Sequence, residues 1–500
     1  MTQTTTDTDG TAMEDILASA AEASEGFGET LPADRARLLR AVAAAIDADG
    51  EELVSIAMEE THLPAGRLGG ELIRTTFQLR LFAELLDDGL FLGATIDHPD
   101  PDWPMGARPD LRRVLDPIGP VAVFAASNFP FAFSVAGGDT ASALASGCPV
   151  VLKAHPGHPQ LSALTGDVVR RALTEGGAPL GTFAVVYGEP AGRRAITDSR
   201  VRASAFTGSL RGGRVLFDLA SSRPDPIPFY GEFGSLNPVF VTAGALAERR
   251  ESILSGFADS FTLGAGQFCT KPGLIFVPLD AGLGEELASL VRQRAAAPLL
   301  NEHIHHGYTA MLERLVAHPA ITPAVHGDQS SAPDPTPTLL STTADKLITH
   351  ADDLLVECFG PTAIIVTYRN DDELLRVVEA FDGQLTATVH GSPSDPTAAE
   401  LVRRLRSRSG RVLWNGWPTG VSVTDAMHHG GPFPATTNSL HTSVGTAAIT
   451  RFLRPICYQS MPQNLLPPAL RDDNPLRLPR WVDGHLVQPE TALATDRTHG

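Results

Sequence analysis

Three side chains in this sequence carry the chemistry needed to form a thioester and then hydrolyse it: Cys269, Glu232 and Asn128. Cys269 lies among small residues in Gly-Ala-Gly-Gln-Phe-Cys-Thr-Lys-Pro-Gly (264–273), which suits a thiol displayed on a loop or at a helix end. A thiolate is a nucleophile, a carboxylate can act as a general base, and a carboxamide can donate a hydrogen bond to an oxyanion. Taken alone, Cys269 is more simply explained as a buried packing residue, so a catalytic role depends on the other candidate residues in the sequence.

A second candidate site follows a predicted strand that ends at Phe206. The small residues Gly208 and Ser209 come next and lead into a predicted helix. The free N–H groups and positive dipole end of such a helix suit a pyrophosphate. A plain serine N-cap explains the same segment equally well.

Two groups of histidines invite a metal interpretation. His303 and His306 could share one face of a helix, but acidic or sulfur partners at ligand spacing are missing. The pair His428-His429 is interpreted as a loop near the substrate mouth rather than as a metal site. No metal site is therefore predicted.

The elements that must position these residues alternate between strand-like and helical patterns. Helical spacing covers 13–60 and 68–88, and 94–119 is expected to be extended. The next strands are predicted at 121–125, 150–152, 183–186 and 203–206. Helical segments separate them, which predicts parallel βαβ units and an α/β fold. A second alternating region runs from 231 to about 430, with strands predicted at 274–277, 362–366, 386–390 and 411–415. Residues 322–345 are rich in proline and threonine and are expected to form a surface excursion.

Composition limits the partners and the location. The 500 residues exceed what one hydrophobic core usually supports, so two or more domains are expected. The formal net charge of −19 argues against a nucleic-acid or anionic-membrane partner. Four cysteines are too few for a disulfide framework, and the polar, acidic N-terminus does not resemble a signal peptide. A soluble, cytoplasmic protein is therefore predicted.

Six motifs occur in an order and spacing that resemble the aldehyde dehydrogenase superfamily along nearly the whole chain. They are Asn128-Phe-Pro-Phe, Val151-Leu-Lys-Ala-His-Pro, Phe206-Thr-Gly-Ser, Glu232-Phe-Gly-Ser-Leu-Asn-Pro, Gly266-Gln-Phe-Cys and Glu357-Cys-Phe-Gly-Pro. The segments Gln267-Phe-Cys-Thr-Lys-Pro-Gly-Leu and Gly431-Pro-Phe-Pro-Ala-Thr-Thr most resemble the 2-oxoglutarate-semialdehyde (2,5-dioxopentanoate) dehydrogenases and their NADP-dependent relatives.

This resemblance implies a role for each candidate residue. Cys269 would attack the aldehyde carbon, the Asn128 amide and the Cys269 N–H would bind the oxyanion, and Glu232 would be the base that activates water. The cofactor would be held by Lys153, Gly208, Ser209, Glu357 and Phe359. NAD-preferring relatives place a glutamate three residues after the lysine, where this chain has Pro156. Without that carboxylate Lys153 can pair with a 2′-phosphate, so NADP is predicted, with NAD possible.

The resemblance also implies the domain organisation. We expect a doubly wound dinucleotide-binding domain from 1–99 and 118–230, an α/β catalytic domain at 231–435, and a C-terminal tail at 463–500. Residues 100–117 and 436–462 would form a small β oligomerisation arm, which pairs subunits into a homodimer or homotetramer.

The resemblance implies oxidation of 2,5-dioxopentanoate to 2-oxoglutarate. A broad-specificity or fatty aldehyde dehydrogenase is the first alternative, because Phe129, Phe131 and Phe133 would suit an apolar aldehyde. An acyl-transferring relative and a non-catalytic structural relative are the others. The presence of Glu232 argues against an acyl-transferring relative. The presence of all the candidate catalytic and cofactor residues argues against a non-catalytic structural relative. The residues that would clamp a keto acid cannot be named, because 131–146 contains no arginine or lysine.

Overall fold

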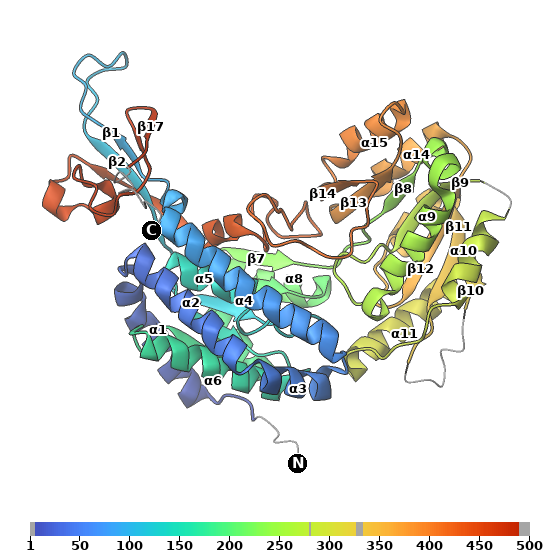
Figure 1. Ribbon diagram of the computed structural model, residues 1–500, viewed down its shortest axis with the longest axis horizontal. Helices are drawn as coiled ribbons and strands as arrows, with labels where there is room; N and C mark the ends of the chain where they lie inside the picture. Colours follow the sequence, from blue (N-terminus) through green and yellow to red (C-terminus); the bar gives the residue numbers. More distant parts are fainter. Residues whose placement is uncertain (1–5, 280–281, 327–333, 490–500) are drawn as a thin grey trace, which may run out of the picture.

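Two mostly parallel sheets and a smaller mixed sheet organise the computed structural model, which describes residues 6–279, 282–326 and 334–489 (Figure 1). The first sheet is fully parallel, in the order β5-β4-β3-β6-β7. Its strands are β3 (Val121–Phe124), β4 (Val150–Lys153), β5 (Phe183–Val186), β6 (Ala203–Thr207) and β7 (Phe229–Glu232). The strand order reverses direction at β3, as in a doubly wound sheet.

Helices cover both faces of this sheet because its strands are apolar on both sides. Val121 and Val123 belong to one buried cluster, whereas Ala122 and Phe124 belong to another on the opposite face. The first face is covered by α2 (Pro32–Ala48), α4 (Ala65–Asp88), α5 (Gly138–Ser146) and α6 (Pro159–Glu175), with α3 (Gly50–Thr61) beside them. The second is covered by α1 (Gly10–Gly28), α7 (Glu189–Thr197) and α8 (Leu210–Ser221).

The second sheet has the order β10-β11-β12-β9-β8-β13-β14 and is parallel except for the β10–β11 pair. Its strands are β8 (Val239–Val241), β9 (Leu274–Pro278), β10 (Thr322–Val325), β11 (Thr338–Thr343), β12 (Thr362–Tyr368), β13 (Gln384–His390) and β14 (Ser409–Trp414). The helices of this region are α9 (Ala243–Thr262), α10 (Leu283–Arg292), α11 (Glu302–Val316), α12 (Ala344–Thr349), α13 (Ala351–Leu354), α14 (Asp371–Val377) and α15 (Pro396–Leu405).

The expected surface excursion at 322–345 was wrong for β11, whereas β10 is an exposed edge strand. Strand β11 lies inside the second sheet, between β10 and β12, and Leu339 and Leu340 are fully buried. Residues 327–333 of this segment lie outside the described residues. The prolines and threonines on either side made the short apolar run hard to detect in the sequence. The run is a core strand because a parallel strand pairs with it on one side.

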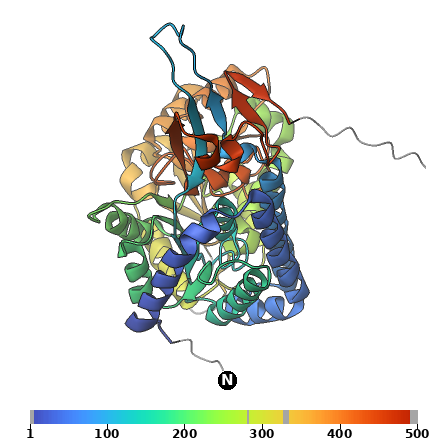
Figure 2. The same ribbon diagram turned by 90° about the vertical axis from the view of Figure 1, so that its left-hand side faces the viewer.

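The third sheet stands at one end of the molecule, and the hairpin between β1 and β2 extends beyond it (Figure 2). Its order is β15-β2-β1-β16-β17, from β1 (Thr95–Asp97), β2 (Leu111–Pro117), β15 (Leu453–Gln459), β16 (Arg480–Val482) and β17 (His485–Val487). The tail predicted from 463 therefore supplies two strands of this arm sheet, and residues 446–452 pack on α5 instead. Within the described ranges, no helix is both long and apolar enough to cross a membrane.

Candidate active site

Cys269 is presented by a tight turn between α9 and β9. Gly264, Ala265 and Gly266 all have left-handed backbone conformations, with φ of 58°, 54° and 67°. A side chain at Gly266 is excluded, because its Cβ would lie 2.1 Å from the Gly360 carbonyl oxygen. The turn fixes the direction of the following segment, and the Cys269 side chain at its end is half-buried and accessible.

The Asn237 side chain bonds to the backbone of the loop that carries Cys269. Its Nδ2 lies 2.9 Å from the Cys269 carbonyl oxygen and 3.0 Å from that of Lys271. The Thr386 hydroxyl donates to Asn237 Oδ1 at 2.9 Å, which fixes the orientation of the amide. Asn237 belongs to the Glu232 motif, so this bond network couples the two parts of the site.

Replacement of Asn237 by alanine is expected to lower the free energy of unfolding by about 2–3 kcal/mol, because several buried carbonyl groups lose their donor. Urea unfolding measures this loss, and kcat should fall with it because the cysteine loop is released. Asn301→Ala is the matched control: it removes the cap of α11, costs about 1 kcal/mol and leaves kcat unchanged. Unchanged stability and kcat in Asn237→Ala would contradict this role.

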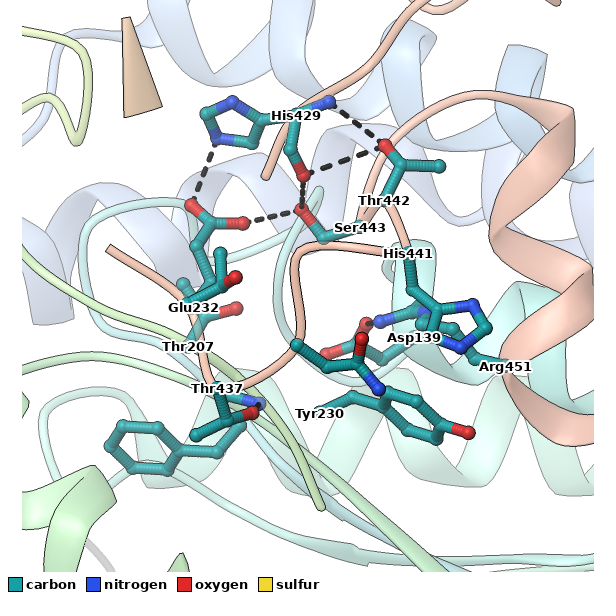
Figure 3. Close-up of a pocket in the computed structure, with 14 residues that line it drawn as sticks. Asp139, Thr207, Tyr230, Glu232, His429, Thr437, His441, Thr442, Ser443 and Arg451 are labelled. Carbon is teal, nitrogen blue, oxygen red and sulfur yellow. Dashed lines mark hydrogen bonds and ion pairs between the residues drawn. The ribbon is translucent and has the colours of Figure 1, made fainter. Parts of the chain in front are cut away.

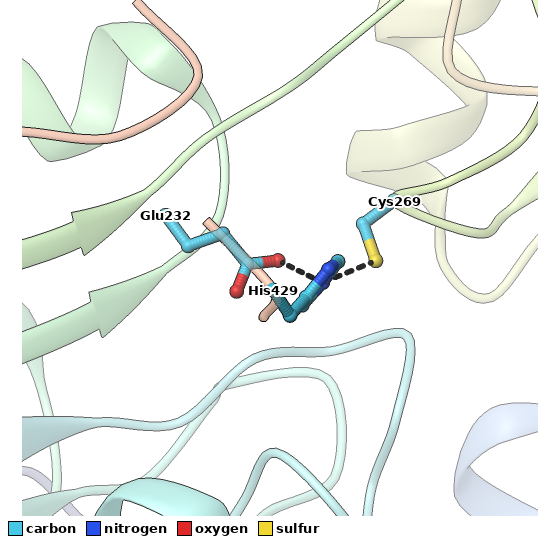
Figure 4. Close-up of side chains that lie close together, drawn as sticks. All are labelled: Glu232, Cys269 and His429. Atoms are coloured by element: carbon cyan, nitrogen blue, oxygen red, sulfur yellow. Dashed lines mark hydrogen bonds and ion pairs between the residues drawn. The ribbon is translucent and has the colours of Figure 1, made fainter. Parts of the chain in front are cut away.

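A histidine lies between the cysteine and the carboxylate (Figure 4). His429 Nε2 is 3.4 Å from Cys269 Sγ and 2.8 Å from Glu232 Oε1. Both His429 and Glu232 are almost inaccessible to solvent, with 1% and 4% of their surfaces exposed. The sequence indicated only a loop near the substrate mouth for His429, and its position between Cys269 and Glu232 is seen only in the fold.

The loop that carries His429 lies along the outer edge of β7 and is hydrogen-bonded to it (Figure 3). Phe233 N donates to Ala435 O at 2.8 Å, and Thr437 N donates to Gly231 O at 3.0 Å. The chain then returns, and the Ser443 hydroxyl donates to Glu232 Oε2. These contacts run the loop antiparallel to β7 and bring His429 and Ser443 onto the carboxylate at the end of that strand.

A second set of bonds fixes the His429 backbone. Its N–H donates to Thr442 Oγ1 at 2.8 Å, and its carbonyl oxygen accepts from Ser443 N at 2.9 Å. The backbone of His429 is therefore held by the returning segment at Thr442 and Ser443, in addition to the contacts of its imidazole.

Electrostatic interactions link the members of the Glu232–His429–Cys269 trio. Burial raises the pKa of Glu232, but the charge of His429 and the hydrogen bonds from His429 and Ser443 outweigh it and hold the pKa below its ordinary value. Burial lowers the pKa of His429, but the Glu232 carboxylate and the Cys269 sulfur outweigh it and raise the pKa to about 10. The imidazolium is thus the favoured form at neutral pH, and it stabilises negative charge on the sulfur.

The same three side chains have the composition of a metal site, since their ligand atoms lie within 4.8 Å of one another. Among the described residues they are the one such group of histidine, cysteine and acidic side chains. His429 Nε2 faces both partners, 3.4 Å from the sulfur and 2.8 Å from the carboxylate oxygen. The arrangement suits proton transfer to and from the sulfur.

Asn128 lies next to this trio, after β3. It is buried, and its Nδ2 donates to the Gln267 carbonyl oxygen at 3.2 Å, two residues before the nucleophile. The amide carries a second hydrogen for another acceptor. No partner within the described residues accepts from the Cys269 N–H. One amide hydrogen and one backbone N–H are therefore available near the sulfur.

The predicted cofactor residues lie along the carboxyl ends of the first sheet and on the facing loop. Lys153 ends β4, and burial lowers its pKa. Ser209 caps α8, where its Oγ accepts from Gly212 N at 3.2 Å, and Gly208 N donates to the Glu232 carbonyl oxygen. A helix N-terminus at this edge is the usual place for a pyrophosphate, so the residues fit a dinucleotide.

Glu357 and Phe359 lie on the loop between α13 and β12. The Glu357 carboxyl packs against Gly234, where an added Cβ would lie 1.9 Å from Oε2. Burial raises the pKa of Glu357 to about 7, against the opposing charge of Lys271. Phe359 follows on the same loop and is half-buried.

Lys271 was also missed by the sequence analysis. It is buried, and its Nζ donates to the carbonyl oxygens of Cys358 at 2.7 Å and Thr362 at 2.9 Å. It therefore ties the nucleophile loop to the Glu357 loop. Its position in Cys-Thr-Lys-Pro was visible, but the partners lie about ninety residues away.

Comparison with known proteins is consistent with this geometry. A family model described as "Aldehyde dehydrogenase family" matches residues 1–451. An "Alpha-ketoglutaric semialdehyde dehydrogenase" of Acinetobacter baylyi is 44% identical over 92% of this chain and 89% of its own length. "Alpha-ketoglutaric semialdehyde dehydrogenase 2" of Azospirillum brasilense is 45% identical over 90% of this chain and 87% of its own.

A solved structure extends the comparison to the fold. The crystal structure of a bifunctional proline utilization A (PutA) protein is similar over 91% of this chain, with a TM-score of 0.77. The chain spans about half of that protein (46%), and at 21% identity the likeness shows the fold alone.

Proposed function

Because the chain belongs to the aldehyde dehydrogenase family, we propose that it oxidises an aldehyde to a carboxylic acid through a thioester on Cys269. The observation that carries this proposal is the accessible Cys269 sulfur 3.4 Å from the His429 imidazole, which is itself paired with Glu232. The trio lies where the carboxyl end of β7 meets the cysteine loop, beside the residues that fit a dinucleotide.

The first half of the reaction forms the thioester. The Cys269 thiolate, stabilised by the His429 imidazolium, attacks the aldehyde carbon, and the C=O bond becomes an oxyanion. The free hydrogen of the Asn128 amide and the Cys269 N–H bind this oxygen; the loss of one such donor typically costs about 10²–10³ in rate. As the C=O bond re-forms, the C–H bond of the former aldehyde breaks and its hydrogen leaves as hydride, for which a bound NAD(P)⁺ would be the acceptor.

The second half hydrolyses the thioester. Once acylated, the sulfur no longer carries the charge that His429 balances, and Glu232 is the base that takes a proton from the attacking water. The C–S bond then breaks, the carboxylate product leaves, and the sulfur regains its contact with His429. An acyl-transferring enzyme needs no such base, so the buried, oriented Glu232 favours hydrolysis.

Lys153, Gly208, Ser209, Glu357 and Phe359 are proposed to hold the cofactor. Lys153 would reach the adenosine ribose or a 2′-phosphate, Ser209 and Gly208 the pyrophosphate, and Glu357 the nicotinamide ribose. NADP is proposed as the preferred form, because Pro156 leaves no carboxylate at the position that repels a 2′-phosphate. The negative charges of Glu189 and Asp7 also act on Lys153, which limits the preference for NADP over NAD.

Lys153→Met is expected to lower the ratio of kcat/KM for NADP to that for NAD by at least about tenfold, which corresponds to about 1.4 kcal/mol. The reason is that a lysine contact with a phosphate is charge-assisted, whereas its contact with a ribose hydroxyl is not. Steady-state rates with each cofactor measure the ratio. Lys346→Met, on exposed α12, is the control and should leave it unchanged. An equal loss with both cofactors would show that Lys153 does not select for NADP.

The proposed substrate is 2,5-dioxopentanoate, which is alpha-ketoglutaric semialdehyde, and the product is 2-oxoglutarate. The names of the two relatives at 44% and 45% identity support it. Initial rates with 2,5-dioxopentanoate and hexanal, each with NAD and NADP, test it. A kcat/KM preference above about tenfold for the dioxo acid is expected. Equal or better use of hexanal would instead show a broad-specificity or fatty aldehyde dehydrogenase.

Assembly and location follow as proposals. Strand β15 ends its sheet, and its outer edge has no partner strand within the described residues, so we expect it to pair across subunits in a homodimer or homotetramer. All four cysteines are unpaired, which suits a reducing cytoplasm.

A further inference from the structure

Three arginine side chains near the nucleophile lack a carboxylate partner within the described residues: Arg67, Arg74 and Arg411. The chain has 58 acidic against 39 basic side chains, so acidic partners are abundant. Buried Arg451 pairs with Asp139 at 2.7 Å, whereas buried Arg223 bonds to backbone carbonyl oxygens. The three arginines near Cys269 are half-buried, and the Glu71 charge acts on Arg67 and Arg74, but none of the three forms an ion pair at contact distance with a described residue.

Arg67 touches both segments of the reaction centre. Its Nη2 donates to the Asn128 carbonyl oxygen at 2.7 Å. Its guanidinium carbon lies 4.7 Å from the ring centre of Phe268, the residue before Cys269, and 5.4 Å from that of Phe129. Its Nη1 is buried and has no partner in the described part of the chain.

Arg74 lies two turns further along the same face of α4. The intervening Glu71 accepts from the N–H groups of Phe131 and Ala132, so this face is turned toward the segment after Asn128. Arg74 Nη1 donates to the Val421 carbonyl oxygen, and its Nε is buried without a partner among the described residues. Burial lowers the pKa of Arg74, while the charge of Cys269 acts in the opposite direction.

Arg411 reaches the same loop from β14. Its Nη2 donates to the Pro418 carbonyl oxygen at 2.8 Å, and the Gly420 carbonyl oxygen lies 3.3 Å from Nη1. Its Nε is likewise buried and unpartnered within the described ranges. Burial lowers the pKa of Arg411 as well, and again the charge of Cys269 opposes it. The loop that ends at Val421 is therefore held between two arginines whose charges both interact with the sulfur.

We infer that Arg74 and Arg411 bind the carboxylate end of the substrate, and that Arg67 positions the aromatic wall between this subsite and Cys269. The inference rests on the proposed function and names the residues that select an ω-oxo carboxylate there. Forked guanidinium donors match the geometry of a carboxylate, and a bound carboxylate neutralises the unpaired cations. An alkyl aldehyde would leave both half-buried charges without an ion pair, so the site favours an anionic aldehyde over a fatty one.

The test uses two aldehydes with the same five-carbon chain, 5-oxopentanoate and pentanal, which differ only in the carboxylate. The ratio of kcat/KM for the acid to kcat/KM for pentanal is measured in the full-length enzyme. Arg74→Leu and Arg411→Leu are each expected to lower this ratio at least tenfold, mainly through KM for the acid. Arg74→Lys keeps the charge and should restore part of the ratio.

Arg80→Leu is the matched control, because Arg80 lies on the same helix and pairs with Asp47 away from the site. It should leave the ratio unchanged. Arg74 also holds the Val421 carbonyl, so thermal unfolding checks each variant. If Arg74→Leu does not fold, Arg411→Leu and Arg74→Lys decide the result.

Two outcomes would overturn the inference: an unchanged ratio in the folded leucine variants, or an equal loss with both aldehydes, which would make the arginines merely structural. A wild-type enzyme that does not prefer the acid at all would overturn the proposed substrate instead. The two failures are therefore distinguishable.

Discussion

Cys269→Ser is expected to lower kcat/KM for aldehyde oxidation at least about a thousandfold, because a serine hydroxyl next to the same imidazolium is not ionised and cannot form the thioester. The loss should appear in kcat, since the substrate and cofactor contacts are intact. Production of reduced cofactor measures it with either NAD or NADP. The size of the effect follows from the role of the sulfur, which forms the only covalent bond to substrate in the proposed reaction.

The matched control is Cys457→Ser, on the exposed edge of β15, which should retain full activity. Thermal unfolding should show that Cys269→Ser is folded, because the side chain is half-buried and the exchange is nearly isosteric. Activity within tenfold of wild type would contradict the thioester mechanism. Wild-type protein without activity on any aldehyde would favour the non-catalytic alternative.

His429→Gln is expected to lower kcat/KM about a hundredfold at pH 7, and the loss should shrink as pH rises. Glutamine can still donate one hydrogen bond but carries no positive charge, whereas the wild-type imidazolium keeps its charge until the pH rises toward 10. Rates of the variant and the wild type should therefore converge between pH 6 and pH 10. His428→Gln, in the neighbouring residue, is the control for disturbance of the loop.

The pH dependence of stability gives an independent readout. The pKa of His429 is raised to about 10, so the folded state binds this proton more tightly than the unfolded state. The resulting stabilisation is complete below about pH 6.5, the ordinary value, and is lost as pH rises toward 10. The pKa of Glu232 is lowered, so its stabilisation is present above its ordinary value and is lost as pH falls.

The difference in Tm between wild type and His429→Gln should accordingly narrow from pH 6.5 to pH 10. A constant difference across this range would show that His429 is not charged in the folded protein. A rate profile in the variant parallel to that of the wild type would show that the imidazole does not act on the sulfur.

The parts of the fold that could be predicted are those with a strand or helix pattern in their own local sequence. The strands expected at 121–125, 150–152, 183–186 and 203–206 correspond to β3 through β6, and the parallel order follows from the helices between them. The family was identified from motifs, and the comparisons confirm it. The arm strand β1 lies within the segment 94–119 that was expected to be extended, whereas β16 and β17 escaped, because three residues leave no periodicity to detect.

The missed site residues share a different cause. His429 is 160 residues from Cys269 and 197 from Glu232 in the chain, and only the folded loop along β7 brings them together. Arg74 and Arg411 likewise meet through one loop, although 337 residues separate them. Such residues look like ordinary loop and helix charges in sequence. A histidine beside Gly-Gly-Pro-Phe-Pro was the one available signal, and it pointed to a loop rather than to the sulfur.

The loop along β7 constrains how this gene can change. Backbone hydrogen bonds from Phe233 and Thr437, together with the two bonds of the Thr437 hydroxyl, set its alignment with the strand. Gly430 and Gly431 leave no room for a side chain, and one inserted or deleted residue between His429 and Thr437 would slide the imidazole past the carboxylate. The hairpin between β1 and β2 carries no such alignment with the site. Descendants of the gene are free to vary the length of the hairpin, but the β7 segment must keep its number of residues for the enzyme to remain active.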